Sequence, residues 1–328
     1  MGASADIRVG FIGLGRICSL LEDDPLREKP ASHAGAFAAR EDAGFLGGYD
    51  TDPQRARAFA ARWNTEAMPT PAALVERRPD ILVVATHPDS HLEYLRLAVR
   101  HRVPVVVMEK PVAAGRRQAR AMQRLEQRGP TRIVVNHERR FSRDYALARS
   151  ALAERRFGAL CGVHARLFFG RTQRRDRVLL HDGTHLLDAI AFLAGGSLRL
   201  HRRVGRLRSS RGSTMLHGSV GVDRVPVGIE IGSGRNFLHF EITLSCEHGE
   251  ILIGNGLFSW RESRVSPYYS AYRSLAELHR NVPVPTGYFT GVAAEALRLV
   301  RDPDAKSRSS IADGRATVRE IRRAAWRF

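Results

Sequence analysis

Lysine is scarce in this chain, although basic residues as a group are abundant. The 328 residues include 52 Lys and Arg against 34 Asp and Glu, a net charge of +18, and the lysines among them are Lys29, Lys110 and Lys306. The arginines are scattered through every segment, without a basic tail or a zinc knuckle, which favours a coding bias over a nucleic-acid-binding face. We therefore predict no nucleic-acid partner, and a lone arginine is weak evidence for any site.

Cysteine and long apolar runs are equally scarce. Cys18, Cys161 and Cys246 are too widely spaced to indicate a disulfide framework or a metal cluster. No uninterrupted apolar run approaches the roughly 18 residues that span a bilayer, and the N-terminus shows no export signal. The sequence thus predicts a cytoplasmic protein without a membrane partner, and its length allows two domains.

Short β-type runs alternate with amphipathic stretches in the first part of the chain. This pattern is typical of a parallel sheet with crossover helices. We expect strands at 7–12, 45–49, 81–85, 103–108 and 133–136, and helices at 53–62, 71–77, 91–101 and 115–127. Residues 1–134 are therefore predicted to form an α/β Rossmann domain, a doubly wound parallel sheet.

The pattern changes after residue 136. Helical stretches at 145–154 and 184–194 and a strand near 162–169 precede β-type runs at 215–222, 225–231, 238–245 and 250–253, and helices at 291–300 and 311–325 end the chain. Residues 135–328 are predicted to form an α+β domain with a large, mostly antiparallel open sheet. Because large apolar faces rarely stay open to water, we expect this sheet to drive self-association into a homodimer or homotetramer.

A glycine turn follows the first expected strand. Gly13 permits a tight turn and Gly15 lets the backbone approach a pyrophosphate, while Cys18 stands where the dinucleotide fingerprint has a third glycine. Arg16 and Ile17 lie in the same turn. The sequence therefore predicts a dinucleotide-binding turn.

Asp50 ends the second expected strand. A carboxylate there can accept hydrogen bonds from an adenosine ribose and repels a 2′-phosphate, which favours NAD over NADP. The alternative is a helix N-cap before Pro53.

The interval between Gly13 and Asp50 is longer than the usual ~20 residues. The polar segment from Glu22 to Pro30 interrupts the expected helix after the glycine turn. It is either a lid or substrate-contacting loop beside the ligand crevice, or a plain surface excursion.

Two further motifs carry candidate chemistry. Lys110 follows an apolar run, and its compact ammonium can have a tuned pKa, which arginine lacks. His181 and His185 are four residues apart before an apolar helix. Such a pair can bind a metal, but no third ligand at suitable spacing is evident, so we expect no metal and assign His185 to proton transfer during hydride transfer.

Together these motifs resemble one family. The chain is similar to the glucose-fructose oxidoreductase, inositol dehydrogenase and rhizopine-catabolism (Gfo/Idh/MocA) family in Gly13-Leu-Gly15, Glu109-Lys-Pro111 and Gly183-Thr-His-Leu-Leu-Asp188, and also in Ala85 to His91 and Asn136 to Phe141. The resemblance covers nearly the whole chain. It implies NAD(P)-dependent oxidation or reduction of a sugar, cyclitol or related carbinol.

The resemblance also implies roles for single residues. Lys110 would hold the substrate oxygen, His185 would be the acid/base, and His181 stands where the family commonly has aspartate, so it either takes over the proton relay or marks a recast pocket. The cofactor-binding residues would be Gly13, Gly15, Arg16, Ile17, Asp50, Thr86, His91, Glu109 and Pro111.

The substrate is less well defined. Arg171 opens a basic segment, 171–177, that could grip a carboxylate or phosphate, so the small-molecule substrate can be anionic. Asn136, Arg139 and Asp182 are further candidates for substrate binding. Two alternatives stay open: a biosynthetic reductase of an imine, enone or other non-sugar carbonyl, and a cofactor-binding sensor without catalysis.

Overall fold

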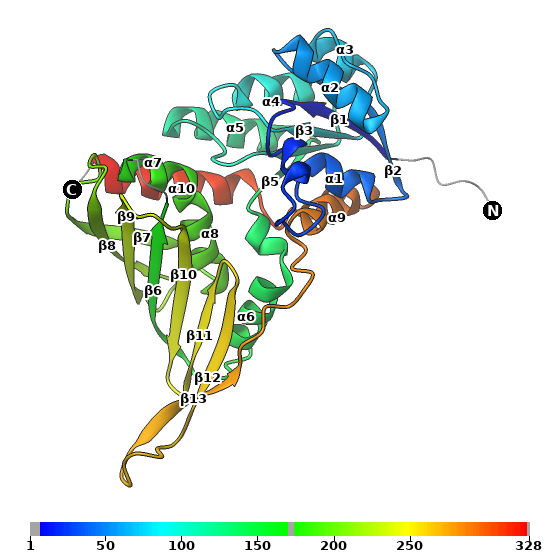
Figure 1. The fold of residues 1–328 in the computed structure, drawn as a ribbon. Coiled ribbons are helices and arrows are strands. Elements are labelled where there is room, and N and C mark those ends of the chain that lie inside the picture. The colour runs from blue at the N-terminus through cyan, green and yellow to red at the C-terminus, as the bar shows by residue number, and fades with distance from the viewer. Residues whose placement is uncertain (1–6, 170–173, 327–328) are drawn as a thin grey trace. The chain divides into compact units, whose positions relative to one another are not determined.

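The chain folds into two compact units, each with its own sheet and apolar core (Figure 1). The computed structural model describes residues 7–169 and 174–326. Unit 1 comprises Met1–Phe141 and Gly287–Arg315, and unit 2 comprises Ser142–Thr286 and Ala316–Phe328. This division differs from the expected boundary between residues 134 and 135, because a C-terminal segment returns to the first unit.

The sheet of unit 1 is parallel throughout. Its strands are β1 (Ile7–Ile12), β2 (Ala43–Tyr49), β3 (Ile81–Val84), β4 (Val105–Met108) and β5 (Arg132–Val135). They lie in the order β2-β1-β3-β4-β5. Every residue of β3 and β4 is buried, as expected for strands covered on both faces. The predicted Rossmann sheet is confirmed, with strand ends within two residues of those expected.

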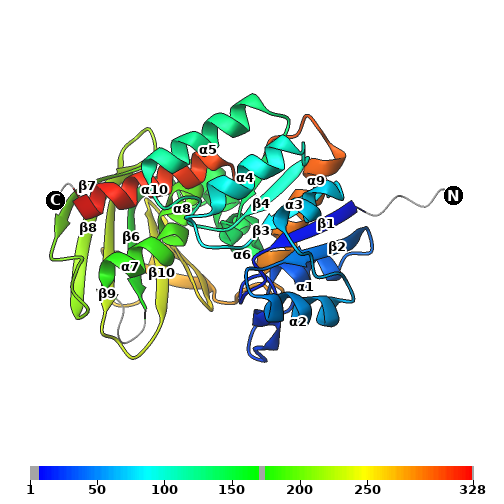
Figure 2. The same cartoon turned by 90° about the horizontal axis from the view of Figure 1, so that it is seen from above.

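Four helices of unit 1 match the sequence pattern. They are α2 (Pro53–Trp63), α3 (Pro71–Glu76), α4 (His91–Arg100) and α5 (Arg116–Arg128). Asp52 caps α2 by accepting the Gln54 N–H at 2.9 Å, and Thr70 caps α3 by accepting the Ala73 N–H at 3.0 Å. Figure 2 shows α3, α4 and α5 on one side of β1 and β3, with α1 and α2 on the other.

The first helix after the glycine turn is split by the inserted segment. Residues 16–19 form a turn, a short 3-10 helix, η1 (Leu20–Asp23), follows, and α1 (His33–Ala38) begins later. The His33 N–H donates to the Ile17 carbonyl at 3.2 Å and the Ala34 N–H to that of Cys18 at 2.8 Å. These bonds take the place of the i to i−4 bonds of a continuous helix, so residues 19–32 form an excursion from one helix.

The excursion is braced internally. The Lys29 ammonium donates to the carbonyl oxygens of Glu22 and Asp24, each at 2.7 Å, which satisfies carbonyls at the end of η1. Glu22 Oε1 accepts the Ala31 N–H and the Ser32 hydroxyl, each at 2.8 Å. The expected interruption is confirmed, while a role as a lid or substrate-contacting loop stays a prediction.

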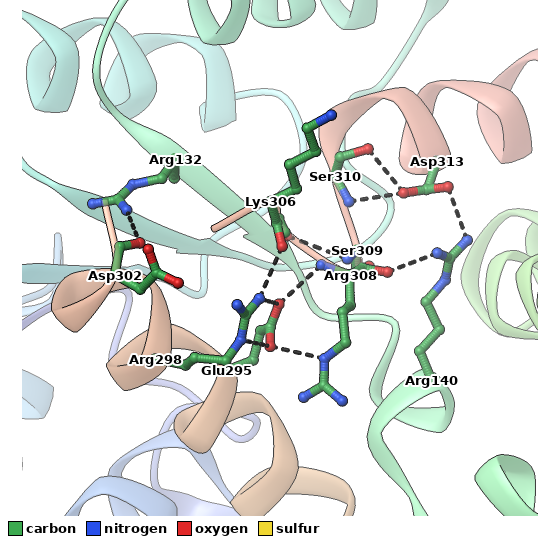
Figure 3. Close-up of polar contacts among 11 residues, drawn as sticks. Arg132, Arg140, Glu295, Arg298, Asp302, Lys306, Arg308, Ser309, Ser310 and Asp313 are labelled. Atoms are coloured by element: carbon green, nitrogen blue, oxygen red, sulfur yellow. Dashed lines mark hydrogen bonds and ion pairs between the residues drawn. The ribbon is translucent and has the colours of Figure 1, made fainter. Parts of the chain in front are cut away.

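A C-terminal segment completes unit 1. Helix α9 (Tyr288–Arg301) packs on the sheet through residues of the same core, and the Val135 N–H then donates to the Ser309 carbonyl at 2.7 Å, beside the end of β5. Figure 3 shows fully buried Glu295 between the guanidinium groups of Arg298 and Arg308, at 2.9 and 2.8 Å. The shared core and the Val135–Ser309 bond anchor residues 287–315 on the parallel sheet, and the Glu295 ion pairs hold this segment together, which explains the revised boundary.

Unit 2 contains an eight-stranded sheet. Its strands are β6 (Leu160–Phe168), β7 (Leu198–Val204), β8 (Gly212–Val220), β9 (Val225–Ser233), β10 (His239–Cys246), β11 (Gly249–Gly254), β12 (Leu257–Val265) and β13 (Arg273–His279). All neighbours are antiparallel except β6 and β9, in the order β13-β12-β11-β10-β6-β9-β8-β7. The predicted mostly antiparallel sheet is confirmed. Strands β7, β12 and β13 were not expected, because the edge strands β7 and β13 and the neighbouring β12 are largely polar and lack a clear apolar alternation.

Helices cover one face of this sheet. Helices α6 (Arg143–Ala153), α7 (Arg175–His181) and α8 (Gly183–Leu193) enclose the core with the inward side chains of the strands, and α10 (Ile311–Trp326) contributes Ile321 and Ala324. The opposite face is polar, as paired positions on β6 and β10 show: His164 faces Thr243, and Arg166 bonds Glu241 at 2.5 Å. The expectation of an open apolar face is therefore wrong.

Exposed apolar side chains of unit 2 gather instead around the β12–β13 hairpin, which extends beyond the rest of the sheet (Figure 1). They include Val265, Tyr268, Tyr269 and Tyr272, each at least 65% exposed. Among the described residues, no helix is long and apolar enough to cross a membrane.

Candidate active site

The glycine turn lies where the strand order of unit 1 changes direction, between β1 and β3. In doubly wound sheets, ligands bind outside the carboxyl ends of the strands at this point. Gly13 has φ +83°, and a Cβ there would lie 2.6 Å from Thr86 Cγ2 and 2.8 Å from the Ala85 carbonyl oxygen. A Cβ at Gly15 would meet nothing within 4 Å. Gly13 is thus required by the fold, whereas Gly15 leaves open space for a ligand.

The rest of the turn follows the fingerprint. Arg16 is exposed and Ile17 half-buried, so both can contact a ligand, while Cys18 is fully buried in the core of unit 1. Burial, with the nearby charges of Asp50 and Glu109, raises the pKa of the Cys18 thiol. Cys18 therefore packs as a small residue in place of the third glycine and does not act as a nucleophile.

Asp50 holds the glycine turn from the end of β2. Its Oδ2 accepts the Leu14 N–H at 2.7 Å, and its Oδ1 accepts the Asp52 N–H at 3.0 Å. The N-cap of α2 is Asp52, so the alternative that assigned this cap to Asp50 is wrong. The half-exposed Arg55 guanidinium lies 3.3 Å from Asp50 Oδ1. A carboxylate for a ribose and a guanidinium able to bind a 2′-phosphate thus stand side by side.

Thr86 and His91 join the loops after β3 and β4. Half-buried Thr86 bonds the Ser90 hydroxyl at 2.8 Å. The fully buried His91 ring places Nε2 3.0 Å from the Thr86 carbonyl oxygen and Nδ1 3.1 Å from that of Val112. Burial lowers the pKa of this imidazole, so the neutral ring is favoured. The His91 ring lies between the two loops, and its expected role in cofactor binding stays a prediction.

A buried polar cluster lies at the ends of β4 and β5. Glu109 Oε1 accepts from His33 Nε2 at 2.8 Å and from Asn136 Nδ2 at 2.5 Å, while its Oε2 accepts the backbone N–H of Lys110 at 3.1 Å. Lys110 is half-buried, and a cis peptide joins it to buried Pro111. Glu109 therefore fixes the backbone of Lys110, and the expected roles of Glu109 and Pro111 in cofactor binding stay predictions.

The electrostatics of this cluster favour an ionised Glu109. Burial alone would raise the pKa of its carboxyl, but the His33 bond, the charges of His33 and Lys110 and the Asn136 bond together lower it. Burial raises the pKa of nearby Glu138. The carboxylate beside Lys110 is thus held charged by His33 on α1 and by Asn136, directly after β5.

The other candidates of unit 1 lie close by. Asn136 Oδ1 is buried without a hydrogen-bond partner among the described residues, an acceptor that a ligand or water can satisfy. Arg139, in the 3-10 helix η2 (Glu138–Phe141), is buried with its guanidinium 5.7 Å from the centre of the Tyr288 ring. The expected roles of Asn136 and Arg139 in substrate binding stay predictions.

In unit 2, the histidine motif lies at the junction of two helices. Asp182 is both the C-cap of α7 and the N-cap of α8. His181 is exposed at the end of α7, Asp182 is half-buried, and His185 is buried in the first turn of α8. The Thr184 hydroxyl donates to the His181 carbonyl at 2.6 Å, which fixes the junction. Lys110 and His185 belong to different units, so their joint action is a matter for proposal.

Two further expectations concern Arg171 and a metal site. Arg171 lies outside the described residues. No group of three or more His, Cys, Asp or Glu side chains able to hold a metal ion occurs in residues 7–169 and 174–326.

Sequence reasoning missed two residues of unit 1. His33 begins a helix after the excursion, and no spacing links it to Glu109. Arg55 was hidden among many arginines, although its place on the first turn after Asp50 is a usable signal.

The residues present fit a dinucleotide. The cradle has a glycine that excludes any side chain, open space above the next glycine, and a carboxylate at the end of β2. This fold and crevice define a dinucleotide-binding domain of the dehydrogenase type.

Residues 7–137 match the model of the Gfo/Idh/MocA oxidoreductase family, described as an NAD-binding Rossmann fold. Over this segment, which is less than half of the chain, the protein is similar to that family of oxidoreductases.

Comparisons with single proteins agree with the fold. A curated relative, the 1-carboxy-3-chloro-3,4-dihydroxycyclohexa-1,5-diene dehydrogenase of Comamonas testosteroni, is 25% identical over 203 residues, 58% of this chain. The chain spans about half of that relative's length, since the match covers 48% of it.

Two solved structures resemble the whole chain. A Desulfitobacterium hafniense protein described as an NADPH-dependent oxidoreductase has a TM-score of 0.81 at 14% identity, over 98% of this chain and 95% of its own. The UDP-N-acetylglucosamine 3-dehydrogenase of Acidithiobacillus ferrooxidans has a TM-score of 0.74 at 17% identity, over 97% and 96%. At these identities the likeness shows the two-unit fold alone.

Proposed function

We propose that this protein is an NAD(P)-dependent dehydrogenase or reductase that moves hydride between nicotinamide C4 and a carbinol or carbonyl carbon. One observation carries the proposal: the glycine turn, Thr86 and the Glu109–Lys110 pair follow the neighbouring strands β1, β3 and β4 at one edge of one sheet. A cofactor cradle and a compact ammonium thus share the ligand crevice of unit 1.

In this proposal each candidate catalytic residue has a distinct role. The bound cofactor donates or accepts the hydride, and the protein supplies orientation and proton handling. Lys110 holds the substrate oxygen and favours its anionic character, and Glu109, ionised and fixed by His33 and Asn136, holds the lysine's backbone in place. His185 takes the hydroxyl proton during oxidation or returns it during reduction.

His181 and Asp182 decide how that proton reaches water. The exposed His181 lies one turn before the buried His185, and Asp182 lies between them. We assign the relay to His181, because an imidazole changes charge near neutral pH and this one is open to solvent.

The substrate class follows from chemistry that the relatives' names share with the site. The Comamonas relative is named for a carboxylated cyclic diol, and the Acidithiobacillus neighbour for a nucleotide sugar. Both are anionic carbinols. We propose a sugar, cyclitol or nucleotide-sugar-like substrate that carries a negative charge, consistent with the basic residues of unit 2.

NAD is the proposed cofactor, rather than NADP. The Asp50 carboxylate accepts ribose hydroxyls and repels a 2′-phosphate. Arg55 opposes this preference, since its guanidinium lies beside the same carboxylate and is partly exposed. The pair predicts a preference for NADH that depends on the charge of Asp50.

Histidine in place of the family's usual aspartate also suits a second reaction. A biosynthetic reductase of an imine, enone or non-sugar carbonyl would use His181 as a proton donor to a different product. A sensor without catalysis is the alternative from another class, and Lys110 and His185 together argue against it.

Cofactor binding followed by turnover tests the proposal. Protein fluorescence is titrated with NADH and NADPH, and sugars, cyclitols and nucleotide sugars are then screened for a change in reduced cofactor. We expect NADH binding in Lys110→Ala and His185→Ala with turnover reduced by about 10²-fold or more. Full turnover in both variants would refute the assigned roles, turnover of non-sugar carbonyls alone would favour the reductase, and binding without any turnover the sensor.

Self-association and a cytoplasmic location stay predictions. The apolar residues of the β12–β13 hairpin replace the sheet face as the proposed contact for a dimer or tetramer. Light scattering of the wild type and Tyr269→Ser measures whether the hairpin takes part.

A further inference from the structure

An arginine-lined cavity of about 410 Å³ lies within unit 2. It is bounded by α7, α10 and the segment from the end of β7 toward β8, and none of the proposed catalytic residues lines it. Five of its ten lining residues are arginines, whereas Lys and Arg together make up 52 of the 328 residues of the chain. The arginines are Arg177, Arg203, Arg206, Arg208 and Arg322. The enrichment therefore exceeds the general abundance of arginine in this sequence.

A buried guanidinium fixes the loop that carries two of these arginines. Arg175 is 4% exposed, and its Nε donates to the Arg206 carbonyl at 3.0 Å and to the Thr214 hydroxyl at 2.9 Å. Its Nη1 donates to the Arg211 carbonyl. Arg175 thus bonds the backbone of the segment between β7 and β8 on both sides of Arg208, so Arg206 and Arg208 belong to a braced segment.

Basic residues outnumber acidic residues in the lining. Asp176 is its acidic member, and Arg174, which does not line the cavity, bonds that carboxylate at 2.5 Å. Arg203 Nη1 donates to the Ala324 carbonyl at 2.7 Å, which anchors it on α10. Exposed Arg177 and Arg206 bring two like charges to one cavity, and a ligand with several negative charges can bond both guanidinium groups.

The remaining lining residues are apolar: Leu180, Leu207, Ile321 and Ala325. The cavity volume falls in the range of roughly 300–1,000 Å³ that is usual for organic ligands. A ligand that matches this lining has a multiply charged end and an apolar or aromatic body. We propose that the cavity binds an organic oligophosphate of the nucleotide type, with guanidinium groups on the phosphates and the base or acyl part on the apolar floor.

The cavity shares a helix with the histidine motif. Arg177 and Leu180 lie on α7, which ends at His181, and Asp182 joins α7 to α8 with His185. A ligand on Arg177 therefore contacts the helix that sets the position of His181. The oligophosphate can be part of the substrate or a separate effector, and the binding proposal does not depend on the proposed dehydrogenase activity.

Calorimetric titration of the full chain tests the binding. The probes are inorganic triphosphate, ATP and adenosine, each with and without saturating NADH, which blocks the dinucleotide cradle of unit 1. We expect triphosphate to bind in both conditions, ATP to bind at least fivefold more tightly, and adenosine not to bind when NADH is present. Absence of triphosphate binding would overturn the proposal, whether or not NADH binds.

Matched variants locate the site. Arg177→Gln with Arg206→Gln removes two exposed charges from the lining, and we expect at least a tenfold loss of triphosphate affinity. Arg199→Gln with Arg224→Gln removes two exposed charges elsewhere in unit 2 and should change affinity less than twofold. Equal effects of the two pairs would show general charge attraction and refute a defined site. If ATP competes with the substrate during turnover, the cavity holds the substrate's phosphates, and a change in kcat without competition identifies an effector.

Discussion

The two units hold their candidate functional residues in opposite ways. In unit 1, the residues come from the ends of five strands and from α1, and buried hydrogen bonds between distant segments fix them. In unit 2, His181, Asp182 and His185 come from one junction between two consecutive helices. The cradle of unit 1 should therefore fail when one atom is added in the wrong place, whereas the motif of unit 2 should tolerate small changes in its backbone neighbours.

The glycines of the two sites give the largest contrast. In Gly13→Ala, the new Cβ would lie 2.6 Å from Thr86 Cγ2 and 2.8 Å from the backbone oxygen of Ala85, at φ +83°. The backbone of Ala85 cannot yield easily. We expect a loss of about 2–4 kcal/mol in unfolding free energy and of NADH binding. The Cβ of Gly183→Ala would meet the flexible end of Leu179 at 2.8 Å. We expect this variant to lose less than about 1 kcal/mol of unfolding free energy.

Urea unfolding and NADH fluorescence measure both effects, and Gly15→Ala is the control. Its Cβ meets no atom of the protein within 4 Å, so stability should be kept while NADH affinity falls. Equal stability of the Gly13 and Gly183 variants would contradict the contrast between the units.

The buried link between α1 and β4 comes next in size. His33→Ala leaves the Glu109 carboxylate without its 2.8 Å donor, and we expect about 1–3 kcal/mol of destabilisation and a lower kcat, because the Lys110 backbone loses its fixed partner.

His33→Gln separates the loss of the hydrogen bond from the loss of a titrating imidazole, because a glutamine amide can still donate but does not titrate. Stability is measured by urea unfolding, and kcat is measured from pH 5 to 9. Restored stability and kcat are expected for this variant, whereas a kcat as low as that of His33→Ala would show that the imidazole itself is needed.

The difference between local sequence patterns and bonds between distant segments also decides what the sequence alone can predict. Strands β1 to β5 are predicted to within two residues, because each is a short apolar run bounded by turn residues. A glycine or a polar residue within two positions after each run marks the ligand edge. The pair of His33 and Glu109 is not predictable in this way, since it joins residues 76 positions apart and depends on how an excursion of residues 19–32 folds back. Local patterns therefore identify the strands and the turn, and tertiary bonds decide which side chains support them.

Unit 2 shows where the pattern itself is weak. Strands β7 and β13 lie at the sheet edges and β12 lies next to one of them, so polar side chains dominate and the alternation is lost. The open face is polar as well, which reversed the expectation of an apolar face. Residues 287–315 were assigned to the second domain because sequence order alone cannot reveal that a C-terminal helix packs on the first sheet.

Asp50 and Arg55 of unit 1 allow a test of cofactor choice with a smaller expected effect. Asp50→Asn keeps an acceptor for the Leu14 N–H and removes the charge, while Arg55 stays available for a 2′-phosphate. We expect the ratio of NADPH to NADH affinity to rise about tenfold, which corresponds to about 1.4 kcal/mol. Adding Arg55→Ala should cancel the gain. An unchanged ratio in Asp50→Asn would show that Asp50 serves the glycine turn alone and does not select the cofactor.

The smallest effect concerns a carboxyl group at the edge of unit 1. Glu126 on α5 accepts the Ile311 N–H at 3.3 Å, and burial raises its pKa from about 4.5 to about 7. The folded state therefore favours the protonated form, so stability is unaffected below the unfolded pKa and falls as the pH rises from about 4.5 to about 7. Glu126→Gln keeps the acceptor without the charge. We expect it to raise the unfolding free energy at pH 8 by about 1 kcal/mol, after allowing for partial exposure, and to change little at pH 4.5. Urea unfolding at both pH values tests this, with exposed Glu154→Gln as the control, and an equal gain at both would assign the effect to α5 packing rather than to ionisation.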